Sequence, residues 1–178
     1  DILALAADQK KAVRRAARLC KADLLTGLVG EFPSLQGQVG RELALNEGMP
    51  ETVARAIAEH YLPAGADDEL PATPEGTALA LADKIDVMAA CFALGHEPSG
   101  SQDPYALRRN ALGVLMILEE RELDARLSDL IRAADASLEE QSEELGNEDL
   151  TVPVDRVLDF FRDRLYHAAM DAGHPHDL

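Results

Sequence analysis

Two carboxylates, Asp83 and Asp86, lie three positions apart in the stretch ALADKIDVM, residues 80–88. At about 100° per residue they flank the direction of Leu79 and Ala82, so a helix here turns both toward the core. A buried carboxylate without a partner costs roughly several kcal/mol. A divalent metal, a basic side chain from a neighbouring helix or helix N-terminal N–H groups could each satisfy them. Ion pairing or capping is the favoured answer, with a metal as the alternative.

His60 is the histidine that bears on the metal alternative, because in EHYLP it lies on the same side of a helix as Val53 and Ile57. A single inward histidine is more often a hydrogen-bonded core residue than a ligand, and a metal site needs three or four ligands. No Ser/His/Asp or Cys/His spacing and no Gly-rich phosphate loop is present. Cys20 and Cys91 form no CxxC motif, and we expect two reduced core thiols in a cytoplasmic protein.

The charge balance is strongly acidic, with 17 Lys and Arg against 33 Asp and Glu and a net charge of −16. This argues against broad non-specific binding of nucleic acid, which requires a basic footprint. One segment stands out as a local exception, and it is either a contact for phosphate or an acidic partner, or a solvated helix face. Its basic residues are Lys10, Lys11, Arg14, Arg15, Arg18 and Lys21.

The elements that position these residues are predicted to be helices. The sequence is 47% hydrophobic, with 4% aromatic residues and no Trp, which favours an all-α fold over a sheet. Thr73 with Pro74 and Asp103 with Pro104 form N-cap and N1 pairs that open two of the helices. The predicted helices span about 2–25, 51–62, 74–94, 104–118, 123–142 and 154–171, with short helical pieces over 30–43.

Two features bear on the extent of the chain. The acidic stretch EEQSEELGNED, near 139–150, is too poor in apolar residues to pack and is predicted to be a linker. The chain begins at Asp1 and contains no apolar run near the roughly 18 residues that a membrane span requires, so we expect a soluble fragment.

Four blocks of sequence resemble the β subunit of the bacterial tetrameric glycyl-tRNA synthetase. They are KADLLTGLVGEFPSLQGQVGRELA, AIAEHYLP, LPATPEGTALALADKIDVMAACFALG and PSGSQDPYALRRNALGVLMIL. They occur in the family's order and near its spacing, covering about residues 16–120, with weaker similarity beyond. A block match of this length is much more specific than any single motif.

The resemblance implies an HD-like helical domain over 1–120 and a helical extension over 121–178 toward the body and anticodon-binding region. In this family the α subunit makes glycyl-adenylate from glycine and ATP, with Mg, and the β subunit chiefly recruits and orients tRNA(Gly). The implied partners are therefore the α subunit, in an α2β2 tetramer, and tRNA(Gly), with no membrane or DNA. No aminoacylation centre and no cofactor is expected in this fragment.

The HD superfamily binds metal through a first His, a His-Asp pair and a later Asp. Asp83 matches the later Asp, and Asp23 in CKADLL matches the Asp of the pair. Lys21 and Ala22 precede Asp23 where the histidine belongs, and no upstream His exists in this chain. The resemblance thus marks Asp23 and Asp83 as degenerate metal positions and does not favour phosphohydrolase chemistry.

Three functions remain as hypotheses: a noncatalytic module that binds or orients tRNA, a metal-dependent HD-type phosphohydrolase, and a structural scaffold between subunits. In the first, the basic residues inside the matching blocks are the candidate phosphate contacts. Each could instead form an intramolecular ion pair; Lys84 and Arg109, for example, could neutralise Asp83, Asp86 or Asp23. The candidates for tRNA contact are Lys21, Arg41, Lys84, Arg108 and Arg109.

Overall fold

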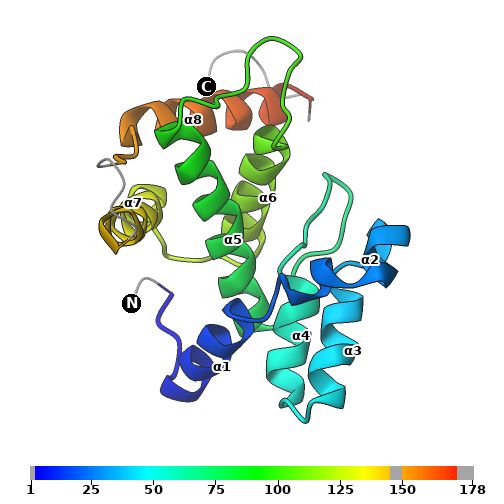
Figure 1. Cartoon of the computed structure of the whole chain (residues 1–178). Helices are drawn as coiled ribbons and strands as arrows, with labels where there is room; N and C mark the ends of the chain where they lie inside the picture. The colour runs from blue at the N-terminus through cyan, green and yellow to red at the C-terminus, as the bar shows by residue number, and fades with distance from the viewer. Residues whose placement is uncertain (1–2, 145–149, 172–178) are drawn as a thin grey trace. The chain divides into compact units, whose positions relative to one another are not determined.

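The computed structural model describes residues 3–144 and 150–171, and within these it contains helices and no strand (Figure 1). The predicted all-α fold is confirmed, while its HD-like character stays an expectation from the resemblance. The α-helices are α1 (Ala7–Ala17), α2 (Gly27–Glu31), α3 (Gln38–Asn46), α4 (Glu51–Glu59), α5 (Pro74–Ala93), α6 (Leu107–Glu120), α7 (Leu127–Glu144) and α8 (Val154–Asp171). Two 3₁₀-helices, η1 (Ala22–Leu25) and η2 (Pro33–Leu35), lie on either side of α2.

The chain divides into two compact units, one over residues 3–83 and one from residue 84 onward. The division falls within α5, so the first half of this helix belongs to the first unit. The sequence-based boundary at residue 120 rests on the resemblance rather than on packing, and it remains a prediction.

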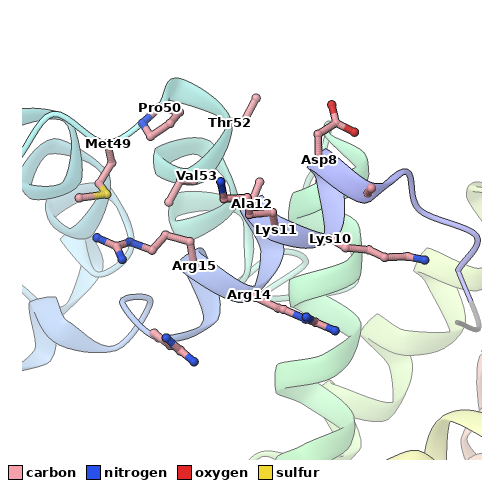
Figure 2. Close-up of a pocket in the computed structure, with 12 residues that line it drawn as sticks. Asp8, Lys10, Lys11, Ala12, Arg14, Arg15, Met49, Pro50, Thr52 and Val53 are labelled. Atoms are coloured by element: carbon pink, nitrogen blue, oxygen red, sulfur yellow. The ribbon is translucent and has the colours of Figure 1, made fainter.

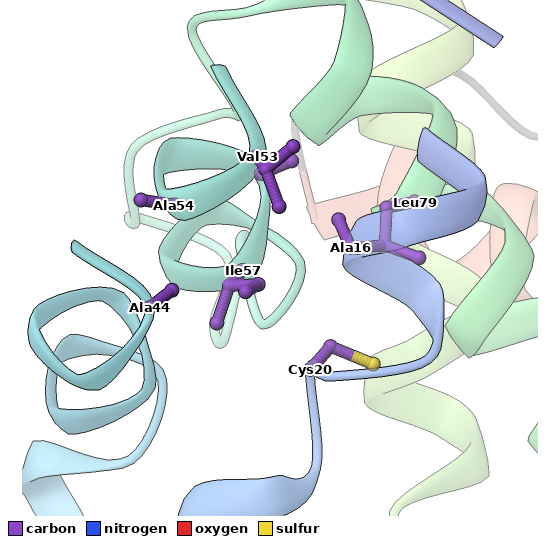
Figure 3. Close-up of a cluster of buried hydrophobic side chains, with 8 residues drawn as sticks. Ala16, Cys20, Ala44, Val53, Ala54, Ile57 and Leu79 are labelled. Carbon is purple, nitrogen blue, oxygen red and sulfur yellow. The ribbon is translucent and has the colours of Figure 1, made fainter. Parts of the chain in front are cut away.

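The core of the first unit forms where α4 packs between α1 and α3. Figure 3 shows Val53 and Ile57 of α4 between Ala16 of α1 and Ala44 of α3. All four side chains are buried, and the small alanines allow the helix axes to approach closely. The apolar stripe of α1 is thereby used for packing, which leaves its basic side to solvent.

The glycine-punctuated segment over 30–43 forms short pieces, as predicted: α2, η2 and the start of α3. Gly37 has φ +78°, a conformation that side-chain-bearing residues rarely adopt. A Cβ at Gly40 would lie 2.8 Å from Cγ2 of Ile57 and 3.2 Å from Oδ2 of Asp23. These glycines therefore allow α3 to approach α4 and η1 closely.

The predicted cap of α5 is confirmed. Thr73 Oγ1 accepts a hydrogen bond from Gly76 N at 3.0 Å and donates one to Oε2 of Glu59 at 2.6 Å. Glu59 also accepts from Thr73 N at 3.0 Å, which ties the end of α4 to the start of α5. Glu59 is buried, and this cap accounts for its burial.

The second unit packs α8 against both α6 and α7. Its buried apolar residues include Val114 of α6, Ile131 of α7 and Phe161 of α8. Val152 N donates to Oδ1 of Asp135 at 2.8 Å, which connects α7 to the segment before α8. The predicted helix over 154–171 is confirmed at both ends.

Several predicted helices were wrong in their bounds. The helix predicted over 123–142 begins only at Leu127, and the helix predicted over 51–62 ends at Glu59. The helix predicted over 2–25 runs only from Ala7 to Ala17, because the chain then turns so that Asp23 can enter the core. The helix predicted to start at Pro104 begins at Leu107, after Ala106 in the left-handed region at φ 55°. Asp103 still caps it, accepting from Leu107 N at 2.7 Å and Arg108 N at 3.0 Å, but it reaches the helix across a turn.

Helix α7 continues to Glu144, into the segment predicted to be an acidic linker, and Ser142 on it is buried. The rest of that linker, residues 145–149, lies outside the described residues. None of the helices in the described ranges is both long enough and apolar enough to cross a membrane.

Candidate functional site

Asp23 is fully buried and binds backbone N–H groups. Its Oδ2 accepts from Gly37 N at 2.6 Å and from Gly40 N at 3.2 Å, both in the first turn of α3. The N-cap of α3 is Gly37, which has no side chain that could accept a hydrogen bond from these N–H groups. The carboxylate of Asp23, 14 residues earlier in the chain, caps the helix instead. The buried negative charge thus lies at the positive end of a helix.

Asp83 meets the ammonium of Lys21. Lys21 Nζ lies 3.0 Å from Oδ1 and 3.1 Å from Oδ2 of Asp83, and 4.4 Å from the centre of the Tyr61 ring. Burial, followed by the Asp23 and Asp83 carboxylates, raises the pKa of Tyr61 from 10.0 to about 12. Of the three answers that the sequence left open for Asp83, the structure shows the basic side chain: Asp83 pairs with Lys21.

The residues at the degenerate metal positions do not fit a metal centre of the HD type. Lys21 places a cation on Asp83, and the Oδ2 of Asp23 is occupied by two N–H donors. Across residues 3–144 and 150–171, no three His, Cys, Asp or Glu side chains gather so that they could hold a metal ion. An ammonium and a metal cation would repel one another at this distance.

His60 is fully buried, as its position beside Val53 and Ile57 predicted. Its Nδ1 lies 2.6 Å from the carbonyl oxygen of Ile57, so this nitrogen carries the proton and donates. The ring stacks at a tilt on Tyr61, with centroids 3.8 Å apart. These contacts are those of a core histidine.

The predicted orientation of α5 was wrong in part. Asp86 and Ala82 are exposed, whereas Lys84 is buried at 4% exposure. Helix α5 is apolar on nearly every side, so its hydrophobic period does not select one buried face. Sequence periodicity therefore could not show that Asp83 and Asp86 differ.

The other candidate tRNA contacts are in different environments. Arg41 pairs with Glu42 at 2.7 Å and with Glu51 at 2.8 Å. Arg108 donates to the carbonyls of Gly100 at 2.8 Å and Gln102 at 3.4 Å, which holds it against its own loop. Arg109 is exposed on α6. The structure thus brings Lys21 together with Asp83 and Tyr61, and does not gather the five candidates into one site.

A groove lies between the basic side of α1 and the start of α4, within the first unit (Figure 2). Its volume is about 830 Å³. Met49, Pro50 and Thr52 line its α4 side, and Figure 2 shows the Arg15 side chain extending toward Met49. The sequence indicated the basic cluster but not these neighbours, because they reach α1 only through the packing of α1 on α4.

Comparison with known proteins gives the family. The profile described as "Glycyl-tRNA synthetase beta subunit" matches residues 1–178. This chain is also similar to three proteins named "Glycine--tRNA ligase beta subunit". It is 50% identical to the one from Citrifermentans bemidjiense, 49% identical to the one from Rhodospirillum centenum and 45% identical to the one from Halalkalibacterium halodurans. These matches cover 90%, 93% and 94% of this chain but 23%, 22% and 24% of the relatives, so the chain spans under a quarter of their length. The chain belongs to the glycyl-tRNA synthetase beta subunit family.

Proposed function

We propose that this chain is one portion of a glycine–tRNA ligase β subunit, and that it binds or orients tRNA(Gly) without a catalytic centre of its own. The complete enzyme, with an α subunit in an α2β2 tetramer, charges tRNA(Gly) with glycine in the cytoplasm. ATP and Mg serve the α subunit. The observation that carries this proposal is the family match over the full 178 residues.

The noncatalytic role is supported by the contacts at Asp23 and Asp83. In an HD phosphohydrolase these carboxylates hold the metal, whereas here one caps α3 and the other pairs with Lys21. The pair also holds Lys21 over the Tyr61 ring, so this lysine is positioned by the fold. Both carboxylates thus have structural partners.

Among the candidate contacts, Arg109 has the environment that best suits a phosphate contact, because it is exposed on α6. Arg108 is half-buried and bonded to carbonyls, which leaves part of its guanidinium for a second ligand. Burial of Lys84 does not favour a direct contact.

The test reverses Arg109, alone and together with Arg108, in the complete enzyme. We expect Arg109→Glu to raise the KM for tRNA while glycine-dependent ATP–pyrophosphate exchange, which reports adenylate formation, stays normal. Arg126→Glu, an exposed charge reversal in the same unit, is the matched control. The single variant is the cleaner one, because Arg108→Glu also releases the loop at Gly100. Unchanged tRNA kinetics in both variants would refute the assignment of these residues.

A scaffold role is a second candidate, and one observation favours it. Large apolar side chains are exposed along η1, α2 and η2, with Leu25 the most exposed at 92%. Exposed apolar patches often mark surfaces that another domain or subunit covers. The exposed residues are Leu24, Leu25, Leu28, Phe32 and Leu35.

The two roles separate in one assay on the complete enzyme. If the patch is a contact between subunits or domains, Leu25→Glu lowers the stability of the assembly, measured by its dissociation on dilution, and leaves tRNA affinity per intact enzyme unchanged. Ala22→Glu, at an exposed position in the same 3₁₀-helix, is the control. Normal assembly in Leu25→Glu would argue against the scaffold role of this patch.

A further inference from the structure

The groove beside α1 concentrates positive charge in an acidic chain. Five of the chain's 17 lysines and arginines line it, and Asp8 is the acidic residue among the lining side chains. The basic residues are Lys10, Lys11, Arg14, Arg15 and Arg18.

The helix itself places these side chains in two rows. Lys10, Arg14 and Arg18 follow one another at four-residue steps, and Lys11 and Arg15 form a parallel row. Four residues of α-helix advance about 6 Å, which is comparable with the separation of successive phosphates along a nucleic-acid strand. At 100° per residue the five positions fall within roughly 140° of the helix circumference. They therefore occupy one broad side of α1, on which Figure 2 shows Arg15 extending toward Met49 and Arg14 and Lys10 extending away from α4.

The neutralisation of charge differs inside and outside the groove. The remaining basic residues of the first unit each have a carboxylate: Lys21 has Asp83, Arg41 has Glu51, and Arg55 has Glu59 at 3.2 Å. Four groove residues are exposed and form no ion pair with a described carboxylate of this chain: Lys11, Arg14, Arg15 and Arg18. The first unit thus leaves its uncompensated positive charge at this one groove, which an anionic ligand would relieve.

The start of α4 adds to the positive potential. Pro50 and Thr52 line the groove at the N-terminal end of this nine-residue helix, where the helix dipole is positive. Glu51 in the same turn could oppose this effect, but its carboxylate is held by Arg41 at 2.8 Å. The dipole and the side chains of α1 therefore act with the same sign.

We propose that this groove binds the phosphate backbone of RNA, and specifically that of the tRNA handled by the complete enzyme. This inference rests on the proposed function and adds a surface to it. Arginine binds phosphate through paired N–H groups, and three of the five cations are arginines. None of the lining residues is aromatic, whereas the centres of protein interfaces are enriched in aromatic residues and depleted in lysine. The lining thus fits a polyanion better than an acidic protein.

Because the lining offers charges rather than groups shaped for base edges, binding here is independent of RNA sequence and sensitive to salt. Each phosphate contact contributes about 0.7 to 0.9 to the slope of log affinity against log salt concentration. The slope is negative, so removing three contacts should make it less steep by about 2 to 3.

The experiment reverses three exposed arginines in the complete enzyme, as Arg14→Glu, Arg15→Glu and Arg18→Glu together. We expect the Kd for tRNA to rise by about tenfold or more, the salt slope to become less steep as above, and ATP–pyrophosphate exchange to stay normal. The matched control reverses three exposed arginines of the second unit: Arg126, Arg132 and Arg162. It imposes the same change in net charge, so an equal loss in both variants would overturn the groove assignment.

A second set of variants replaces Arg14, Arg15 and Arg18 with lysine. Lysine retains the charge and has a helix propensity similar to arginine, so tRNA binding should be largely retained in it. A photo-crosslinking residue at position 15 gives a readout that does not depend on charge reversal: we expect an adduct with tRNA, and none from the same residue at position 132. Adducts with protein only would overturn the proposal.

The outcomes separate this inference from the function on which it rests. Normal tRNA binding in the groove variant, with a loss in Arg109→Glu, would overturn the groove and leave the tRNA role intact. Normal tRNA binding in the groove variant and in Arg109→Glu would argue against the groove assignment and against the proposed tRNA role. Dissociation of the groove variant into subunits at unchanged tRNA affinity would show that the face binds protein, which also overturns the proposal.

Discussion

Replacing Asp23 with alanine should destabilise the first unit strongly. This carboxylate is fully buried and its Oδ2 accepts from Gly37 N and Gly40 N at 2.6 and 3.2 Å. Alanine at position 23 leaves both N–H groups at the start of α3 without that acceptor. Their desolvation is then uncompensated, because the site is closed to water.

The magnitude follows from these contacts. A hydrogen bond to a charged acceptor contributes about 1.5 to 3 kcal/mol, so two contribute roughly 3 to 6 kcal/mol. Against this, the variant no longer buries a carboxylate, whose Oδ1 has no hydrogen-bond partner among the described residues. We expect a net loss of about 2 to 4 kcal/mol in the free energy of unfolding. Asp23→Asn keeps an acceptor oxygen and should lose less.

The assay is amide hydrogen exchange at Gly37 and Gly40, together with urea denaturation of the chain. Exchange reports the first unit locally, which matters because a chain of two units need not unfold in one step. Asp83→Ala is the comparison: its partner Lys21 has a side chain 44% exposed, so this pair contributes about 1 kcal/mol or less.

Two results would refute this reasoning. Unchanged exchange at Gly37 and Gly40 in Asp23→Ala would show that the carboxylate does not hold α3. A loss in Asp83→Ala equal to or larger than that in Asp23→Ala would show that the exposed ion pair, rather than the buried cap, stabilises this region.

Two further predictions concern the same unit. Gly76→Ala should lower the melting temperature, because its Cβ would lie 2.7 Å from the Cβ of Glu59 and displace the α5 cap; Gly27→Ala, with nothing within 4 Å, is the control and should not. Stability should fall as pH rises from about 10 to about 12, because the folded state keeps the Tyr61 proton that the unfolded state releases. Absorbance titration should show one tyrosine ionising near 12, and its persistence in Tyr61→Phe would contradict the assignment.

Local sequence signals predicted much of the fold. Thr73 with Pro74 fixed the start of α5, since a hydroxyl cap and an N1 proline act within one turn. The isolated amphipathic pattern over 154–171 gave α8 at both ends. The glycines over 30–43 likewise indicated short, closely packed pieces. In each case the decisive interaction lies within a few residues along the chain.

Interactions between distant residues decided what the sequence could not. Helix α1 ends at Ala17 rather than near residue 25, because Asp23 is drawn in to cap α3, whose own N-cap is a glycine. Helix α6 begins at Leu107 rather than at the predicted Pro104, because Asp103 accepts from the first N–H groups of the helix across a turn. The environments of Asp83 and Asp86 also differ because of a distant residue. Lys21, 62 positions away in sequence, forms its ion pair with Asp83.

By itself, then, the sequence determined the all-α class, the family resemblance and the presence of a basic cluster in an acidic chain. Composition, helical period and block order can be read from the order of residues along the chain, without knowledge of the fold. Only the tertiary structure decided that Lys21 binds Asp83, and that the basic side of α1 borders a groove at the start of α4. The burial and the charge neutralisation of a side chain depend on which residues distant in sequence contact it. Those contacts are determined by the packing of the helices.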